Sequence, residues 1–297
     1  MKIVFAGCVE FSYSVLAHLL LDKKCDIAGV ITRRASSFNA DFRSLELLAA
    51  QAGIPCFFDT GNNQDDMARW LGEIAPDVVY CFGWSSLLKK EILAIPRLGV
   101  VGYHPTALPQ NRGRHPIIWA LALGLSETAS TFFFMDEGAD SGDILSQVAV
   151  EISPSDDAAS LYGKLVHAAL RQVTTFTAQL ASGAYPHIPQ DHSRASYWRK
   201  RTKSDGRIDW RMSSHSINNL VRALTRPYVG AHCEYGNNEI KIWKAEQAAP
   251  VLSGTERTEP GKVLKVQGRT FLIKCGEGVL RIREHEFDAM PQEGEYL

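Results

Sequence analysis

The stretch KIVFAGCVEFSYSVLAHLLLDKKCDIAGVIT, residues 2–32, decides the fold of the N-terminal part of the chain. Its apolar run at Lys2–Ala6 predicts a buried strand, and the run at Asp26–Thr32 predicts a second one. Between them, Ser14–Leu21 places its large apolar side chains on one face of a helix. A strand, a helix and another strand in this order predict neighbouring parallel strands of one sheet.

The same alternation continues through the first half of the sequence. Further elements are expected at these positions: strands at Pro55–Phe58, Asp77–Phe82, Gly99–Gly102 and Ser130–Phe134, a buried run at Ile144–Ile152, and helices at Ser44–Ala52, Asp65–Ile74, from Pro116 and at Asp157–Ala181. The pattern predicts an α/β domain over residues 1–183 with a mostly parallel, Rossmann-like sheet. Ligands of such sheets bind at the carboxyl ends of the strands.

The C-terminal part has a different character. Residues 184–205 are rich in Pro, His, Ser and basic residues without periodicity, which predicts a linker. In residues 206–297 a predicted helix, Ser214–Leu224, is followed by short strand candidates at Ala231–Tyr235, Glu239–Trp243, Gly261–Val266, Phe271–Lys274 and Val279–Arg283. This order predicts a small β-barrel-like (OB-like) domain.

Composition excludes several classes of protein. The formal net charge is -1, from 32 Lys+Arg against 33 Asp+Glu, whereas a dedicated nucleic-acid binder needs a basic excess. Apolar runs are too short to span a bilayer, and Glu10 interrupts the N-terminal run too early for a signal peptide. The 6 cysteines are far apart, as in a cytoplasmic protein with thiols, and their spacing does not favour a metal site.

The loop after the first strand argues against common cofactor sites. It reads Ala6-Gly7-Cys8-Val9-Glu10, without G-x-G-x-x-G, and Glu10 would repel a pyrophosphate there. The sequence also lacks G-x-x-x-x-G-K-[ST] and G-x-S-x-G. Dehydrogenase, kinase and esterase functions are therefore disfavoured.

Two motifs carry the candidate chemistry. GYHPTALPQNRGR, residues 102–114, places His104 at the end of a predicted strand, where an imidazole can act as a general acid or base. MDEGADSGD, residues 135–143, holds four carboxylates after the next strand. We expect one of these carboxylates to lie against His104 and to fix its tautomer. The alternatives are a histidine that only caps a loop and an ordinary acidic turn.

The two motifs resemble those of the 10-formyltetrahydrofolate-dependent formyltransferases. That family includes methionyl-tRNA formyltransferase and sugar N-formyltransferases, and the resemblance extends from residues 5–7 to 240–244. It implies that His104 and Asp140 are catalytic. The family's Asn is replaced by Gly102, so its hydrogen bond to the formyl oxygen must come from a water, a backbone N–H, protonated His104 or Asn111.

The resemblance also implies the remaining site residues. The formyl donor, 10-formyltetrahydrofolate, is expected to contact Phe82, Trp84, Ser85, Leu87, Arg114 and Asp136. The acceptor is expected near Phe11, Tyr13, Tyr103, Asn111 and Arg112, although the aromatic residues Phe11 and Tyr13 could equally belong to the core. Neither a metal nor ATP is required, because the formyl group is already activated.

The expected acceptor is the amine of a nucleotide-linked amino sugar, such as a pseudaminic-acid-type or 4-amino-deoxysugar precursor. Methionyl-tRNA formyltransferase is one alternative, disfavoured by the near-neutral charge. A non-catalytic folate- or sugar-nucleotide-binding protein is the other, since Gly102 has no amide. In this family the second domain binds tRNA, forms a homodimer or simply packs, and the sequence does not choose among these roles.

Overall fold

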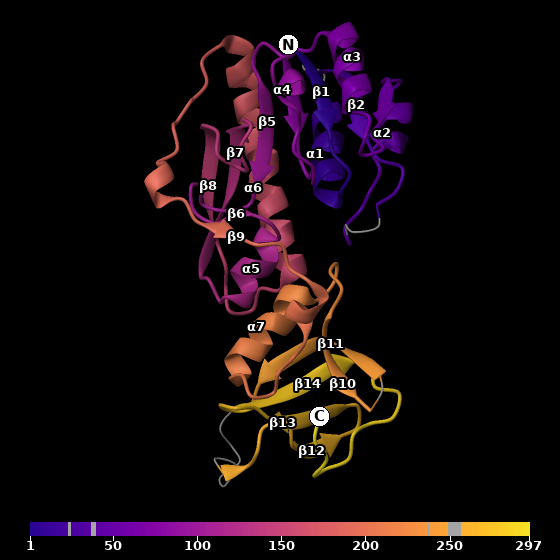
Figure 1. Cartoon of the computed structure of the whole chain (residues 1–297), viewed down its shortest axis with the longest axis vertical. Coiled ribbons are helices and arrows are strands. Elements are labelled where there is room, and N and C mark those ends of the chain that lie inside the picture. The colour runs from indigo at the N-terminus through magenta and orange to yellow at the C-terminus, as the bar shows by residue number, and fades with distance from the viewer. Residues whose placement is uncertain (23–24, 37–39, 237, 249–256) are drawn as a thin grey trace. The chain divides into compact units, whose positions relative to one another are not determined.

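The computed structural model describes the whole chain except residues 23–24, 37–39, 237 and 249–256 (Figure 1). It contains two compact units. The first comprises Met1–Pro116, Thr128–Val150 and Gly163–Trp198, and the second comprises Ile117–Glu127, Glu151–Tyr162 and Arg199–Leu297. Among the described residues, every helix is too short or too polar to cross a membrane.

The first unit is built on a 7-stranded sheet in the order β3-β2-β1-β4-β5-β7-β8. Its strands are β1 (Lys2–Ala6), β2 (Asp26–Thr32), β3 (Cys56–Phe58), β4 (Val78–Cys81), β5 (Val100–His104), β7 (Glu127–Phe134) and β8 (Ile144–Glu151). Strands β3, β2, β1, β4 and β5 pair in parallel, and β7 pairs antiparallel to β5. The predicted Rossmann-like sheet is therefore confirmed.

Helices cover both faces of this sheet. The helices of the first unit are α1 (Glu10–Leu21), α2 (Glu46–Gln51), α3 (Gln64–Ile74), α4 (Lys90–Leu93) and most of α6 (Ala158–Ser182), whereas α5 (Pro116–Ala122) lies almost wholly in the second unit. On one face, Val79 and Cys81 pack with Met67 and Leu71 of α3. On the other, Tyr80 packs edge-on against Phe176 of α6. The central strands are buried on both sides, which explains their continuous apolar runs.

Helix α1 begins at Glu10, four residues before the predicted start at Ser14. The buried Ser12 hydroxyl donates a hydrogen bond to the Phe82 carbonyl at 2.6 Å. This bond lets a polar residue in the first turn face the sheet. The apolar pattern alone could not show that turn, because hydrogen bonding rather than hydrophobic contact satisfies Ser12 there.

The segment after α6 is held to the first unit by strand pairing. Strand β9 (Tyr197–Trp198) pairs in parallel with β6 (Arg112–Gly113), and a short 3-10 helix spans His192–Arg194. A β-carbon on Gly113 would lie 2.3 Å from the Trp198 carbonyl oxygen, and the φ of Gly113 is +105°. Only glycine allows this close backbone approach.

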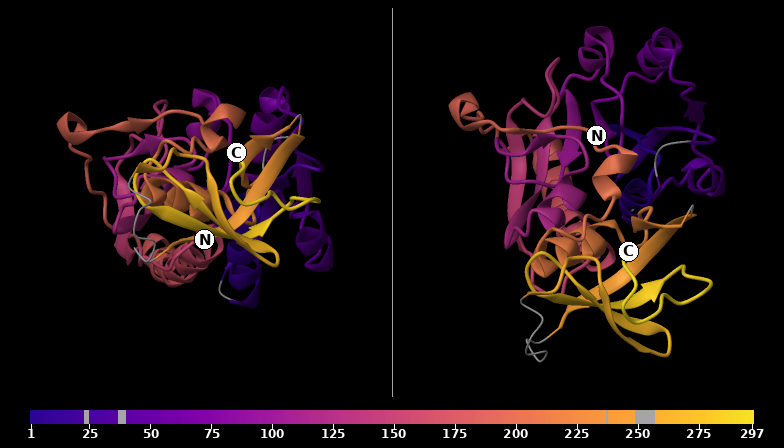
Figure 2. Two further views of the ribbon diagram at one scale, coloured as in Figure 1. Left: turned by 90° about the horizontal axis from the view of Figure 1, so that it is seen from below. Right: turned by 60° about the horizontal axis from the view of Figure 1, so that its bottom comes forward.

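The second unit holds a 5-stranded antiparallel sheet in the order β10-β11-β14-β13-β12, which Figure 2 shows from two further sides. Its strands are β10 (Ala231–Tyr235), β11 (Asn238–Gln247), β12 (Val263–Gln267), β13 (Thr270–Lys274) and β14 (Val279–His285). The 3-10 helix Lys203–Gly206 and helix α7 (Ser214–Leu224) precede them, and the Ser213 side chain caps α7. The predicted β-rich second unit is confirmed.

Candidate active site

His104 ends strand β5 and is 5% exposed. Its Nε2 lies 2.8 Å from the carbonyl oxygen of Asn111. A carbonyl can only accept a hydrogen bond, so Nε2 carries a hydrogen and Nδ1 of the neutral ring holds the lone pair. The tautomer is therefore fixed by the backbone of Asn111, whereas the sequence led us to expect the acidic loop to fix it.

Asp140 lies on the other side of the imidazole ring. Its Oδ2 is 3.6 Å from His104 Nδ1, and the Gly113 N–H donates to the same oxygen at 2.9 Å. The 3.6 Å separation is too long for a hydrogen bond, but a proton taken up by Nδ1 would lie beside this carboxylate. The two motifs thus converge at one end of the sheet with an imidazole that can accept a proton there.

The loop that carries Asp140 is held by its own polar groups. Asp136 Oδ1 accepts hydrogen bonds from Gly138 N–H at 2.9 Å and from the Ser141 hydroxyl at 2.6 Å. Asp140 itself has a φ of +55°, which is uncommon for a residue with a side chain. Asp136 is exposed, and its two hydrogen bonds shape this loop. Its expected contact with the formyl donor stays a prediction.

Gly102 occupies the position where the resembling family has Asn, and the space beyond it is filled. A β-carbon added there would lie 2.9 Å from both Met135 Cγ and Phe133 Cζ. Phe133 is the residue paired with Gly102 across strands β5 and β7. The side chains of Met135 and Phe133 thus occupy the space that an Asn side chain at position 102 would need.

Substitution of Gly102 by Asn is expected to destabilise the protein by about 1–3 kcal/mol, because overpacking forces Phe133 and Met135 to move. Urea unfolding measures the loss. Gly163→Ala in helix α6 is the control, since beyond the helix's own nearby backbone no described residue has an atom within 4 Å of its added β-carbon. That variant should be stabilised by roughly 0.5–1 kcal/mol. An unchanged urea midpoint for Gly102→Asn would show that the amide fits.

Arg112 is among the most deeply buried side chains, at 1% exposure. It donates to the Tyr197 hydroxyl at 2.9 Å and to Gln190 Oε1 at 2.6 Å. These contacts indicate that Arg112 shapes its loop, while its expected contact with the acceptor stays a prediction. Arg114 is exposed, and its backbone N–H donates to the Trp198 carbonyl at 3.1 Å.

Sequence reasoning missed Gln190, Ser196 and Tyr197 as parts of this centre. Ser196 Oγ accepts from the Asn111 N–H at 2.9 Å and its hydroxyl donates to Asn111 Oδ1 at 3.2 Å. All three stand in the segment without periodicity, so no pattern of apolar residues marks them. Gly113, between two arginines, was the one feature of the sequence that could indicate the close approach of another backbone segment.

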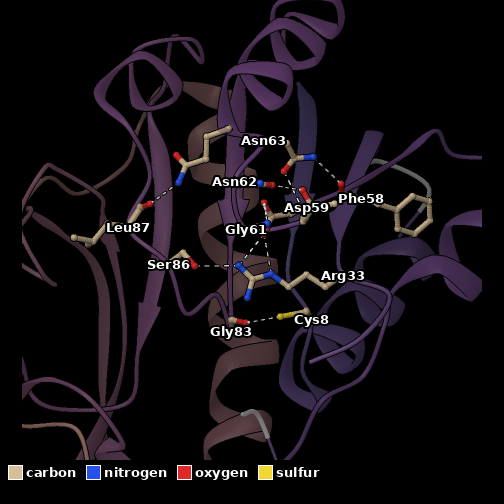
Figure 3. Close-up of polar contacts among 12 residues, drawn as sticks. Cys8, Arg33, Phe58, Asp59, Gly61, Asn62, Asn63, Gly83, Ser86 and Leu87 are labelled. Carbon is tan, nitrogen blue, oxygen red and sulfur yellow. Dashed lines mark hydrogen bonds and ion pairs between the residues drawn. The ribbon is translucent and has the colours of Figure 1, made fainter. Parts of the chain in front are cut away.

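The carboxyl end of β4 forms a second polar region, shown in Figure 3. A small cavity there is lined by Arg33, Asp59, Gly61, Gln64, Met67, Trp84 and Ser86. Arg33 donates to Asp59 Oδ2 at 2.8 Å and to Ser86 Oγ at 3.0 Å, and its guanidinium lies 4.8 Å from the Trp84 ring centre. Trp84 Nε1 is buried without a partner among the described residues.

The other residues expected near the formyl donor occupy varied positions. Phe82 is fully buried, and its backbone N–H and carbonyl are bonded to Ala6 and Ser12. Leu87 is 64% exposed, and its carbonyl accepts from Gln64 Nε2 at 2.9 Å. Ser85 is half-buried. Trp84 is therefore the residue of this set with a buried polar atom still available for a ligand.

The aromatic residues expected near the acceptor split into two groups. Phe11 and Tyr103 stack on each other with ring centres 4.0 Å apart, and burial raises the pKa of the Tyr103 hydroxyl. This arrangement favours the core alternative for Phe11. Tyr13 instead lies under the Arg43 guanidinium, 3.3 Å from the ring centre, and Arg43 also pairs with Glu10 at 2.7 Å.

Within the described part of the chain, His, Cys, Asp and Glu side chains do not gather in groups of three that could hold a metal ion. The candidate centre instead consists of one imidazole, one carboxylate and the backbone groups that orient them. Such a centre is suited to moving a proton during attack by a neutral nucleophile.

Comparison with known proteins identifies several of the same fold. The chain is similar to WlaRD, described as a sugar 3N-formyl transferase crystallised with dTDP and 5-N-formyl-THF, at 19% identity and a TM-score of 0.72, covering 97% of this chain and 99% of that one. It is also similar to the N-formyltransferase from Helicobacter canadensis, crystallised in complex with folinic acid and dTDP-3-aminofucose. That match has 18% identity and a TM-score of 0.71, and it covers 96% of this chain and 99% of that one.

A third solved structure, a 4-N formyltransferase from Francisella tularensis, matches at 18% identity and a TM-score of 0.65, covering 80% of this chain and 94% of that one. Identities of this size show a shared fold. At the level of sequence families, residues 200–293 match the formyl transferase C-terminal domain, and residues 1–175 match the formyl transferase family. Because the latter match extends over more than half of the 297 residues, the chain belongs to the formyl transferase family.

Proposed function

We propose that this protein transfers a formyl group from 10-formyltetrahydrofolate to the amine of a nucleotide-linked amino sugar. The observation that carries the proposal is the convergence of His104 Nδ1 and Asp140 Oδ2, 3.6 Å apart, at the end of strand β5. Two structurally similar proteins were crystallised with a folate together with dTDP or a dTDP-amino sugar. A small sugar nucleotide also suits a chain of net charge -1 better than tRNA does.

The carboxyl end of β4 supports a folate site. In open α/β sheets, ligands bind outside the carboxyl ends of the strands. Trp84 Nε1 is a buried donor without a partner among the described residues, and such donors cost free energy until an acceptor or a water is bound. Trp84, Ser85 and Ser86 would hold the folate, which supplies an activated formyl group when bound.

In the proposed mechanism His104 accepts the proton that the acceptor amine loses as it attacks the formyl group. The Asn111 carbonyl holds the hydrogen on Nε2, so Nδ1 is the atom that accepts the proton, directly or through a water. Asp140 then stabilises the imidazolium, and the Gly113 N–H keeps its carboxylate in place. General acid–base catalysis of this kind contributes typically about 10²–10⁴-fold in rate.

The test is a direct assay of formyl transfer. The purified chain is mixed with 10-formyltetrahydrofolate and a panel of amino sugar nucleotides, and tetrahydrofolate release is followed together with the mass of the acceptor. We expect release only with certain sugar amines, with a mass gain of one formyl group. Release with charged methionyl-tRNA alone would favour the tRNA alternative, and folate binding without any release would favour a non-catalytic binding protein.

A further inference from the structure

Gln190 joins the buried arginine of the His104 loop to the loop that carries Asp140. It is 5% exposed. Its Oε1 accepts from Arg112 Nη2 at 2.6 Å, and its Nε2 donates to the carbonyl oxygens of Asp140 at 3.0 Å and Gly142 at 2.5 Å. One amide therefore holds the backbone on both sides of Ser141.

Arg112 has an unusual environment for a charged group. Its hydrogen-bond partners in the described part of the chain include no carboxylate: they are the Tyr197 hydroxyl, the Gln190 amide oxygen and His192 Nδ1, at 3.3 Å from Nη2. Its Nε lacks a partner there. A buried charge without a carboxylate is costly, so ion pairing does not explain this residue. The guanidinium instead polarises the Gln190 amide, which strengthens the bonds that Nε2 donates.

Asp140 needs such an anchor because its backbone conformation is uncommon. Its φ is +55°, and local steric preference would return the residue to negative φ. The Gly113 N–H holds the carboxylate, and Gln190 holds the carbonyl of the same residue. These two hydrogen bonds, one to the carboxylate and one to the carbonyl, oppose a turn of the carboxylate away from His104.

We propose that Gln190, held by Arg112, is a positioning residue that keeps the Asp140 carboxylate beside His104 Nδ1. The inference rests on the proposed formyl transfer, because it assigns Gln190 a role in that reaction. Gln190 acts through the backbone of Asp140, to which it donates a hydrogen bond. A displacement of about 1 Å at such a centre typically costs on the order of 10²-fold in rate.

The test compares Gln190→Met with Gln172→Met. Gln172 is a matched control, since it is 6% exposed and its Nε2 donates to the Ser130 carbonyl at 3.0 Å and to the Ser146 hydroxyl at 2.8 Å. Gln172→Met loses the two hydrogen bonds that its amide nitrogen donates, and Gln190→Met loses two such bonds and also the one that its Oε1 accepts from Arg112. We expect kcat of Gln190→Met to fall about 10–100-fold with KM values nearly unchanged. The kcat of Gln172→Met should stay within about 2-fold, because neither bond reaches the acidic loop.

Two further variants separate positioning from a general loss of stability. Gln190→Glu keeps the acceptor for Arg112 but turns a carboxylate oxygen toward two carbonyls, so its kcat should also fall even if its melting temperature is maintained. In an Asp140→Asn background, Gln190→Met should lower kcat by less than about 3-fold, because the group it positions is already gone.

Equal kcat values for Gln190→Met and Gln172→Met would overturn the inference, as would a full multiplicative loss in the Asp140→Asn background. A wild-type chain that transfers no formyl group to any amine contradicts the proposed function itself, and this outcome is distinct from the other two.

Discussion

Replacement of His104 by Ala is expected to lower kcat for formyl transfer by about 10³-fold or more. The variant loses the atom that accepts the proton from the amine, a contribution of typically about 10²–10⁴-fold. It also leaves Asp140 Oδ2 without the imidazolium that it stabilises, although the Gly113 N–H still holds that oxygen. Single-turnover measurements with saturating folate and acceptor would report the chemical step directly.

His232 provides the matched control for this substitution. It is also 5% exposed, and burial lowers the pKa of its imidazole, so His232→Ala removes a buried ring of the same size. We expect similar losses in melting temperature for the two variants but an unchanged kcat for His232→Ala. Near-normal transfer by His104→Ala would contradict the mechanism, and equal losses of kcat in both variants would show that folding rather than chemistry is affected.

The fold could be predicted from the sequence because most of its elements are defined by hydrophobic patterning. Helix α7 and strand β10 begin and end at the predicted residues, Ser214–Leu224 and Ala231–Tyr235. Both bury one regular face, so apolar spacing locates them well. The start of α1 was missed because a buried hydroxyl, Ser12, satisfies the first turn.

The candidate site was only partly predictable. The convergence of His104 and Asp140 could be expected only because both stand at the ends of strands of one sheet. The rule for parallel strands does not account for it, because β7 runs antiparallel to β5. The group that fixes the tautomer of His104 could not be predicted, because it is the backbone carbonyl of Asn111. Gln190 was equally hidden, because hydrogen bonds between a side chain and a distant backbone leave no periodic trace in a sequence.

Removal of the Asp59 carboxylate is expected to destabilise the protein by about 3–5 kcal/mol, the usual cost of leaving a buried charge unpaired. Arg33 and Asp59 are 8% and 6% exposed, and their closest N–O distance is 2.7 Å. In Asp59→Asn the guanidinium loses its carboxylate partner and keeps neutral ones such as Ser86 Oγ. Urea unfolding measures the loss, with the slope of the transition showing whether the folded state remains compact.

The Lys89–Asp65 pair supplies the control, because its side chains are 50% and 82% exposed. Asp65→Asn should cost less than about 1 kcal/mol, since solvent screens that pair. The double variant Arg33→Met/Asp59→Leu should recover most of the stability lost in Asp59→Asn, because it removes both charges. A double variant as unstable as Asp59→Asn would contradict this account. Since Arg33 also lies against the Trp84 ring, Asp59→Asn but not Asp65→Asn should raise KM for the folate.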